Sequence, residues 1–222
     1  MAQYKVIERF ISINGEGTKA GQLAVFIRFQ GCNLNCSYCD TSWANKEDAA
    51  YELMDEKEIY AYIIQSGIKN VTLTGGEPLM QNKICDLLEL LSADQGIDVE
   101  IETNGSIEIK EYDNMYNRPA MTMDYKLPSS GMQSHMCMEN LFYMRQKDTV
   151  KFVCGDMKDL RTAYQVIREN KLTTRCHVYL SPVYGQIDMQ EMVEVMKEQR
   201  MNGVNLQLQM HKFIWEPNER GV

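Results

Sequence analysis

Residues 23–41 read Leu-Ala-Val-Phe-Ile-Arg-Phe-Gln-Gly-Cys-Asn-Leu-Asn-Cys-Ser-Tyr-Cys-Asp-Thr. The first seven are rich in branched and aromatic side chains, which predicts a β-strand. The strand leads into Cys32, Cys36 and Cys39 in the spacing C-x3-C-x2-C. Three thiolates on one short loop can each bind one iron of a 4Fe–4S cluster, whose usual complement is four cysteines. A cluster without a fourth protein ligand keeps one iron open to a small molecule, as catalytic metal sites keep an open position.

Other interpretations of these cysteines stay open. A structural zinc site would need four ligands in paired spacings. The fourth ligand could be a histidine or one of the remaining cysteines, none of which forms a second C-x2-C pair: Cys85, Cys137, Cys154 and Cys176. A disulfide is disfavoured in a reducing compartment. Chance clustering of buried cysteines is disfavoured because residues 32–40 are polar and turn-like.

The composition limits the class of protein. The 222 residues include no linker, internal repeat or low-complexity stretch, so we expect one domain over residues 1–222. A net charge of −8 without a long basic run argues against nucleic-acid binding. The chain has no apolar run of membrane-spanning length and no signal peptide at its start. We therefore expect a cytoplasmic protein with no membrane partner, in which seven reduced cysteines indicate metal or redox chemistry.

Strand-like and helix-like segments alternate along the chain. Strands are predicted at 23–29, 69–74, 97–102, 120–125, 149–154, 175–180 and 203–209. Amphipathic helices are predicted between most of them, at 55–67, 84–91, 160–167 and 189–196. Alternation of this kind predicts a parallel sheet of the α/β class. About six units are visible where a complete barrel has eight, so we expect a partial (β/α)6 barrel with mostly parallel strands.

The unusual loops all follow predicted strands. The cysteine loop follows 23–29, Thr-Gly-Gly-Glu-Pro (74–78) follows the next strand, and Glu-Thr-Asn-Gly (102–105) follows the third. Asp-Tyr-Lys (124–126) and Ser-Pro-Val-Tyr-Gly (181–185) end two more. In parallel α/β architectures the chemistry lies beyond the C-terminal ends of the strands, so these loops are expected on one rim.

These motifs together resemble the radical S-adenosylmethionine (SAM) superfamily, in which the open iron binds the methionine part of SAM. A narrower resemblance covers nearly the whole chain and points to the 7-carboxy-7-deazaguanine synthase family. It rests on the cysteine loop, Thr-Gly-Gly-Glu-Pro and four further segments: Phe-Ile-Ser-Ile-Asn-Gly-Glu-Gly (10–17), Phe-Ile-Arg-Phe-Gln-Gly (26–31), Glu-Thr-Asn-Gly (102–105) and Gln-Met-His-Lys (209–212).

The resemblance implies a function and its requirements. A member of this family contracts 6-carboxy-5,6,7,8-tetrahydropterin to 7-carboxy-7-deazaguanine with loss of ammonia, in queuosine and related 7-deazapurine biosynthesis. A 5′-deoxyadenosyl radical acts on the substrate, so no side chain is expected to serve as the catalytic acid or base. A 4Fe–4S cluster, SAM and Mg²⁺ are the implied cofactors. A flavodoxin-type electron donor and a homodimer are the implied partners, and a trimmed radical-SAM core is the implied fold.

Site residues follow from the same resemblance. The cluster is expected on Cys32, Cys36 and Cys39, and Mg²⁺ on Thr41, whose oxygen suits a hard cation. The residues expected to bind SAM are Tyr38, Gly76, Glu77, Glu102, Asn104, Asp124, Tyr125 and Lys126. The residues expected to bind the pterin are Ile13, Asn14, Gly15, Glu16, Arg28, Thr74 and His211.

Three departures from the family pattern stand out. Asn14 replaces the usual glutamine, the usual Ser-Pro-Lys-like turn reads Asp124-Tyr125-Lys126, and the tail 215–222 is longer than in some members. Two other functions stay open. A glycyl-radical-enzyme activating enzyme would share the cysteine loop but act on a protein. A non-enzymatic zinc or iron-sulfur interaction module would bind metal without turnover.

Overall fold

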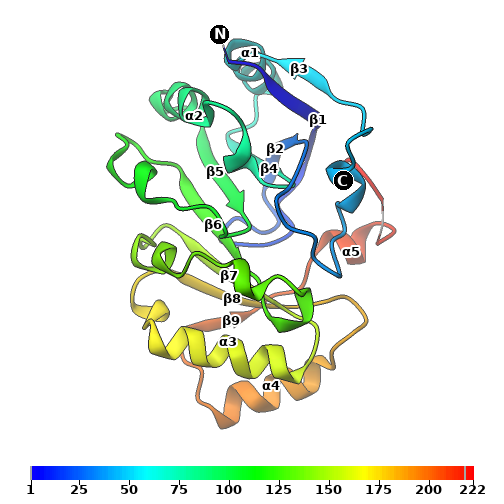
Figure 1. Cartoon of the computed structure of the whole chain (residues 1–222), viewed down its shortest axis with the longest axis vertical. Helices are drawn as coiled ribbons and strands as arrows, with labels where there is room; N and C mark the ends of the chain where they lie inside the picture. Colours follow the sequence, from blue (N-terminus) through cyan, green and yellow to red (C-terminus); the bar gives the residue numbers. More distant parts are fainter. Residues whose placement is uncertain (1, 218) are drawn as a thin grey trace.

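The strand before the cysteines, β2 (Leu23–Phe29), lies in a nine-stranded sheet in the computed structural model, which describes residues 2–217 and 219–222 (Figure 1). Along the sheet the strands follow the order β3-β1-β2-β4-β5-β6-β7-β8-β9. From β2 onward every neighbouring pair is parallel. The predicted parallel α/β sheet is therefore confirmed.

The parallel strands lie close to the segments predicted for them. β2, β6 (Ala120–Tyr125) and β7 (Thr149–Cys154) have the predicted bounds. The others are shifted or shortened by a few residues: β4 (Asn70–Gly75), β5 (Asp98–Thr103), β8 (His177–Pro182) and β9 (Val204–Leu206). The last strand is shorter than predicted because residues 207–210 leave the sheet and approach the first loop, where the Met210 N–H donates to the Gly15 carbonyl.

Two strands were not predicted. β1 (Tyr4–Ile13) pairs antiparallel with β2, and β3 (Glu52–Met54) pairs antiparallel with β1. A register shift between Val6 and Glu8 breaks the polarity alternation of β1, which removes the period-2 signal that identifies a strand. These strands extend the sheet beyond the expected parallel units.

The helices cover the outer face of the curved sheet. Figure 1 shows α1 (Glu56–Ser66) and α2 (Ile84–Ala93) toward one end, and α3 (Met157–Glu169) and α4 (Met189–Glu198) toward the other. The start of α1 is a capping box between Asp55 and Glu58, and the helix ends at Gly67 in the left-handed conformation, as predicted. A short α5 (His211–Ile214) precedes the tail.

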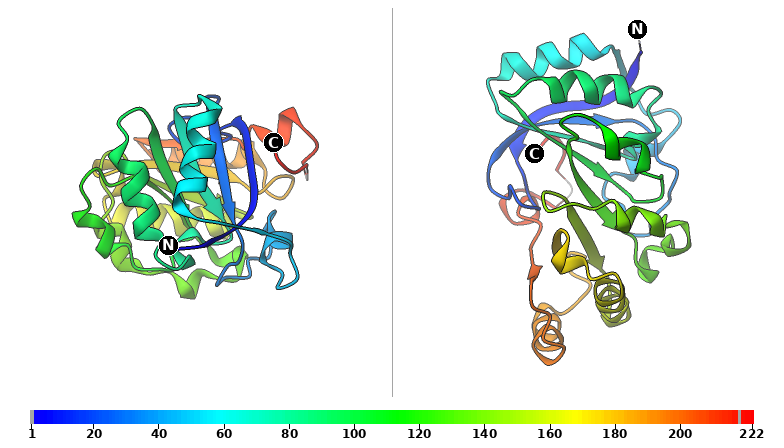
Figure 2. Two further views of the ribbon diagram at one scale, coloured as in Figure 1. Left: turned by 90° about the horizontal axis from the view of Figure 1, so that it is seen from above. Right: turned by 90° about the vertical axis from the view of Figure 1, so that its left-hand side faces the viewer.

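Two of the crossovers carry short 3-10 turns in place of an α-helix. The β5–β6 connection contains Lys110–Asn114, and the β6–β7 connection contains Pro128–Ser130, Gln133–His135 and Met138–Phe142. The barrel is therefore both partial and trimmed, and Figure 2 shows its open curved shape from two further directions. Over residues 2–217 and 219–222, no helix is long and apolar enough to cross a membrane.

The two faces of the parallel strands have opposite chemistry. Side chains that face the helices are apolar and almost fully buried, such as Ile27, Leu73 and Ile101. Their neighbours in sequence face the inside of the barrel and are polar, such as Arg28, Thr74 and Glu102. Because successive side chains of a strand point to opposite faces, one alternating pattern builds both the core and a polar interior.

Candidate active site

A cavity of about 780 Å³ opens at the C-terminal ends of the parallel strands. Its volume lies in the range of small-molecule sites. Loops after β2, β4, β5, β6 and β8 contribute to its wall, together with the β1–β2 loop, α5 and the tail. The strand-end loops therefore lie on one rim, as predicted. All but two of the residues expected to bind a cluster, Mg²⁺, SAM or pterin line this cavity.

The three cysteines of the cluster loop, residues 32–41, all face the cavity. Cys32, Cys36 and Cys39 are half-buried free thiols. The Cys32 Sγ accepts from the Leu34 N–H at 3.4 Å and from Asn104 Nδ2 at 3.5 Å. Burial raises the pKa of Cys32 and of Cys36. These thiols therefore need a bound cation to be thiolates at neutral pH.

The donor set fits a three-cysteine cluster better than zinc. In the part of the chain that the structure describes, no three histidine, cysteine or acidic groups converge on a single ion position. A zinc ion requires such convergence, whereas the thiolates of a cubane bind different irons and stand further apart. The other four cysteines lie outside the cavity wall among the described residues. A small-molecule ligand is left to complete the fourth iron.

The turn 74–78 holds the cluster loop by backbone contact. The Glu77 N–H donates to the Gly31 carbonyl at 2.9 Å, and the Gly76 N–H donates to the Phe29 carbonyl at 3.2 Å. A Cβ at Gly76 would collide with the Gly31 carbonyl, and Gly75 has a φ of 149° that only glycine readily adopts. The two glycines therefore permit the close approach of two loops.

Glu77, one of the residues expected to bind SAM, does not line the cavity. Its side chain is fully buried behind the wall, where the carboxylate accepts from Thr103 Oγ1 at 3.0 Å and from the Asn104 N–H at 2.6 Å. Burial raises the pKa of Glu77 to about 7. Glu77 thus positions Asn104, whose side-chain amide reaches Cys32 and lines the cavity.

Tyr125 is the second residue that the structure places outside the cavity. Its ring packs in the core against Phe152, with centroids 5.3 Å apart, while the neighbouring Asp124 and Lys126 face inward. Strand alternation gives the reason, since the middle residue of an inward pair points outward. Tyr38 does line the cavity, and its hydroxyl donates to the Val153 carbonyl at 3.3 Å.

Arg28 and Thr74 are neighbours in the β2–β4 register and both face the cavity. The Arg28 Nε donates to Glu8 Oε2 at 3.0 Å, and its guanidinium lies 5.8 Å from the Phe10 ring centroid. Glu8 also lines the cavity and stands opposite Arg28 in the β1–β2 pairing. Glu8 therefore orients Arg28, and the terminal N–H groups of the guanidinium are left to bind an anionic group.

The loop between β1 and β2 brings four residues into the cavity: Ile13, Asn14, Gly15 and Glu16. Asn14 is 4% exposed; its Oδ1 accepts from Thr72 Oγ1 at 3.0 Å, and its buried Nδ2 has no hydrogen-bond partner among the residues that the structure describes. Gly15 lies under His211, where an added Cβ would come within 2.7 Å of Nδ1. Burial lowers the pKa of His211, so the imidazole is neutral near pH 7.

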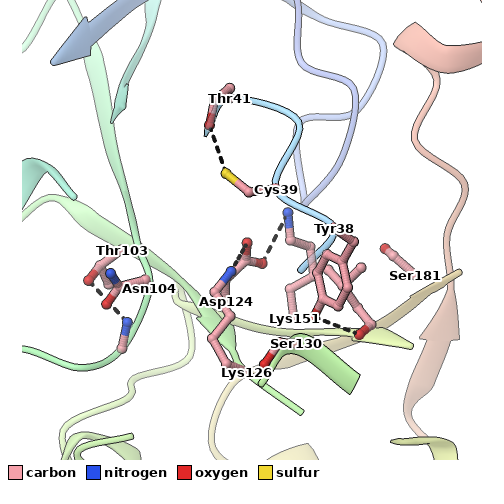
Figure 3. Close-up of polar contacts among 12 residues, drawn as sticks. Tyr38, Cys39, Thr41, Thr103, Asn104, Asp124, Lys126, Ser130, Lys151 and Ser181 are labelled. Atoms are coloured by element: carbon pink, nitrogen blue, oxygen red, sulfur yellow. Dashed lines mark hydrogen bonds and ion pairs between the residues drawn. The ribbon is translucent and has the colours of Figure 1, made fainter. Parts of the chain in front are cut away.

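Acidic and basic side chains alternate inside the barrel, and we call five of them the charged interior: Glu16, Glu102, Asp124, Lys126 and Lys151. Lys151 Nζ lies 2.9 Å from Glu16 Oε2 and 3.1 Å from Asp124 Oδ1. Lys126 Nζ lies 3.2 Å from Asp124 Oδ2. Figure 3 shows Asp124 between the two lysines, with Tyr38 beside them. The two ammonium groups thus neutralise carboxylates from two different segments, the β1–β2 loop and β6.

The pKa values of the charged interior follow from this packing. Burial opposes the charge of Asp124, but Lys126 and Lys151 reverse the effect and lower its pKa. Burial likewise opposes the charge of Lys151, but Asp124 and Glu16 raise its pKa well above the usual value. Glu102 differs, because burial raises its pKa to about 7 and Lys151 only partly counters this. At neutral pH Glu102 is the member closest to its titration point.

Thr41 ends the cluster loop at the cavity wall, with its Oγ1 3.7 Å from Cys39 Sγ (Figure 3). The adjacent Asp40 also lines the cavity, and its Oδ2 lies 3.3 Å from Lys212 Nζ in α5. A hydroxyl beside a carboxylate is an oxygen donor set of the kind that Mg²⁺ prefers.

The C-terminal tail also contributes to the wall of this cavity. Residues 217 and 219–222 line the cavity, and the Arg220 guanidinium lies 3.9 Å from the Trp43 ring centroid. Lys212 Nζ donates to the Pro217 carbonyl at 3.2 Å. The tail is therefore attached to the segment that follows the cysteines.

Some cavity residues were missed by sequence reasoning. Lys151 carried a signal, since it is a lone charge within the apolar segment Thr149–Cys154. Glu8 could be found only once β1 was recognised and paired with β2. Gln209 and Lys212 lie in the segment Gln-Met-His-Lys (209–212), of which only His211 was expected in the site, whereas Trp43 and Arg220 had no chemical pattern around them that indicated a site.

Comparisons with known proteins identify the family of this chain. A family model described as the radical SAM superfamily matches residues 26–124, which include the three cysteines and Asp124. The 7-carboxy-7-deazaguanine synthase of Clostridium acetobutylicum is 55% identical over 219 residues, which cover 99% of each chain. The enzyme of the same name from Methanospirillum hungatei is 37% identical over 96% of this chain and 86% of its own.

A solved structure supports the fold. The crystal structure of QueE from Escherichia coli matches with a TM-score of 0.75 at 23% identity, over 94% of this chain and 95% of that chain. This likeness confirms the α/β partial barrel.

Proposed function

The chain belongs to the 7-carboxy-7-deazaguanine synthase family of radical SAM enzymes, and we propose that its cavity converts 6-carboxy-5,6,7,8-tetrahydropterin to 7-carboxy-7-deazaguanine. The protein is a radical SAM lyase, because substrate and product differ by one ammonia. The observation that carries the proposal is the 55% identity to a synthase over the whole chain. The cavity supports it, since free cysteines and groups suited to a pterin share one opening.

Cys32, Cys36 and Cys39 would hold the 4Fe–4S cluster, and the residues beside them would hold SAM. When bound, these cofactors supply the 5′-deoxyadenosyl radical that removes hydrogen from C6 of the pterin. The chain's own part is to orient both molecules and exclude water. Asp124 can accept from ribose hydroxyl groups, and backbone at Gly76 can approach closely because it has no side chain.

The pterin would occupy the end of the cavity near the β1–β2 loop. Glu16 can accept from ring N–H groups, and the unpaired Asn14 Nδ2 can donate to a ring carbonyl or nitrogen. Arg28 can bind the substrate carboxylate, and neutral His211 can donate or accept above Gly15. Ile13 and Thr74 complete the wall. Each contact would be made by a group that the fold already holds in place.

Mg²⁺ would bind at Thr41, with Asp40 close enough in the loop to supply a carboxylate oxygen. The ion usually keeps several waters and shares ligands with a substrate, so one or two protein oxygens suffice. An acidic group on the substrate would complete the site. Turnover measured against added Mg²⁺, with and without Thr41→Val, tests this part.

The proposal extends to partners and location. A flavodoxin-type protein would supply the electron, because the reaction needs an external one-electron donor to start. The family resemblance supports a homodimer, which sedimentation of the loaded enzyme would reveal. Free thiols that bind iron require a reducing compartment, which supports the cytoplasm.

The testing experiment is an anaerobic incubation of cluster-loaded protein with SAM, reductant, Mg²⁺ and 6-carboxy-5,6,7,8-tetrahydropterin, read by mass spectrometry. We expect 7-carboxy-7-deazaguanine and ammonia. If 5′-deoxyadenosine and methionine formed without the deazapurine, the pterin assignment would be wrong and a protein substrate would become the leading alternative. Zinc without iron or sulfide in the purified protein would identify an interaction module.

A further inference from the structure

Lys151 lies between the proposed pterin end and the proposed SAM end of the cavity and contacts an acid from each. It lies in the middle of β7 and stands opposite Asp124 in the β6–β7 register, so both side chains enter the barrel together. Its ammonium also contacts Glu16, which comes from a loop 135 residues earlier in the chain. Glu16 faces the proposed pterin end, and Asp124 faces the proposed SAM end. One buried cation thus touches an acid from each end.

The contacts of Glu16 show how strongly it is oriented. Its Oε1 accepts from Ser181 Oγ at 2.8 Å, and its Oε2 accepts from Lys151 Nζ at 2.9 Å and from Gln209 Nε2 at 3.3 Å. Lys151 is the charged member of this set, and its side chain is 9% exposed. The other two donors are neutral, so they orient the carboxylate but do not neutralise it.

The charges around Lys151 come from every element packed against it. The titratable groups that face Lys151 or its partner Glu16 are Asp124 and Lys126 at the end of β6, Glu100 and Glu102 in β5, Tyr179 opposite Lys151 in β8, and His211 in α5. Acids outnumber lysines in this set. Asp124 and Glu16 overcome burial and raise the pKa of Lys151 well above normal, so it remains an ammonium ion and is a poor proton donor. A raised pKa favours an electrostatic role over proton donation.

We propose that Lys151 is a positioning residue that keeps Glu16 and Asp124 ionised and aimed into the cavity, and so sets the affinity for pterin and SAM together. Without the ammonium, Glu16 would keep only its neutral donors and Asp124 would keep only Lys126, in an interior beside Glu102, and this loss of positive charge favours protonation of both carboxylates. A protonated carboxyl loses part of its capacity to accept ring N–H or ribose O–H groups. This inference rests on the proposed function, because that function assigns a ligand to each acid.

The test is ligand binding by the cluster-loaded protein without reductant, so that no turnover occurs. SAM and 6-carboxy-5,6,7,8-tetrahydropterin are titrated separately into wild type, Lys151→Met and Lys151→Arg between about pH 6 and pH 9, the range in which buried carboxyls titrate. The matched control is Lys69→Met, which removes a lysine that is 66% exposed and pairs with Asp98 away from the cavity.

For Lys151→Met we expect about tenfold weaker binding of both ligands near pH 7, as when a charged hydrogen-bond partner is lost. The affinity should recover as the pH rises and the acids lose their protons. Lys151→Arg keeps the charge and should follow the wild-type affinity within about threefold at each pH. Lys69→Met should match wild type. A loss in Lys151→Met that is equal at every pH, or no loss, would overturn the inference.

A second variant guards against failure to fold. Lys151→Met with Glu100→Gln removes one acid together with the lysine and restores the charge balance, and Glu100 is a buried carboxyl outside the cavity wall. The double variant should show the same pH-dependent binding of SAM and pterin as Lys151→Met. If wild type binds SAM but no pterin at any pH, the proposed function fails. The SAM titrations then still decide the inference, because Asp124 contacts Lys151 independently of the pterin.

Discussion

The cluster loop and the charged interior share one cavity, but the chain builds them in opposite ways. The cluster loop takes its three cysteines from eight consecutive residues, 32–39. The charged interior takes Glu16, Glu102, Asp124, Lys126 and Lys151 from four separate segments, which only the parallel sheet brings together. The first is a local arrangement, and the second is a product of topology.

This difference predicts which substitutions abolish activity and which only weaken it. Each cysteine supplies a bond to a different iron, so the loss of one thiolate removes the cofactor. In the charged interior Asp124 and Lys151 each have two ionic partners and Glu16 has three donors, so the loss of one weakens binding or shifts a titration without removing the site. We therefore expect all-or-none effects in the loop and graded effects in the interior.

The largest effect is expected for Cys36→Ala. The variant should lose the cluster and all turnover, while the thermal midpoint of the cluster-free protein changes little because the side chain is only half-buried. Iron and sulfide analysis, with product detection, measures this. The matched control, Cys137→Ala, removes a thiol outside the cavity and should keep both cluster and activity. Residual turnover in Cys36→Ala would contradict the expected difference between the cluster loop and the charged interior.

The next effect concerns the stability of the charged interior against pH. Burial raises the pKa of Glu102 to about 7, whereas an unfolded glutamate titrates near about 4.3. The folded state therefore binds this proton more tightly, and the resulting stability is present below about pH 4 and lost as the pH rises through 7. The substitution Glu102→Gln removes the titrating group, and with it this loss of stability as the pH rises.

Relative to wild type, Glu102→Gln should gain on the order of 2 kcal/mol in the free energy of unfolding between about pH 5 and pH 8. Urea unfolding at both pH values measures it. Glu89→Gln on the exposed face of α2 is the control and should follow wild type. Parallel pH profiles of Glu102→Gln and wild type would show that Glu102 titrates normally.

A smaller change is expected for Glu16→Gln, which keeps the shape of the side chain but removes its charge. The loss of charged hydrogen bonds to the pterin should raise the substrate KM by roughly 10- to 100-fold. Steady-state kinetics measures this, with Glu194→Gln on the exposed side of α4 as the control. An unchanged KM would remove Glu16 from the pterin subsite.

The smallest effect is expected at the tail. Arg220→Ala removes the cation–π contact with Trp43, and such contacts at exposed sites contribute about 0.5–1 kcal/mol. The substrate KM should rise by roughly two- to fivefold, and the Trp43 fluorescence should change. Arg161→Ala, exposed on α3, provides the control. Wild-type kinetics in Arg220→Ala would show that the tail contact does not contribute to binding.

The same contrast explains what could be predicted from the sequence. The parallel strands, the capping box of α1 and the shared rim depend on local periodicity and on the direction of parallel strands, which sequence patterns report. The Glu8–Arg28 and Lys151–Glu16 pairs depend on which strands are neighbours and on a loop that crosses the barrel. The side chains of Tyr125 and Glu77 point away from the cavity, which the sequence could not show because a motif identifies a segment but not the direction of each side chain.

One anaerobic assay of three proteins tests most directly whether the cluster loop and the charged interior have separate roles. Wild type, Cys36→Ala and Glu16→Gln are each followed for 5′-deoxyadenosine without pterin and for 7-carboxy-7-deazaguanine with limiting pterin. Wild type should form both, Cys36→Ala neither, and Glu16→Gln should form 5′-deoxyadenosine normally but the deazapurine about tenfold or more slowly. Equal loss of both products in Glu16→Gln, or either product from Cys36→Ala, would contradict the account.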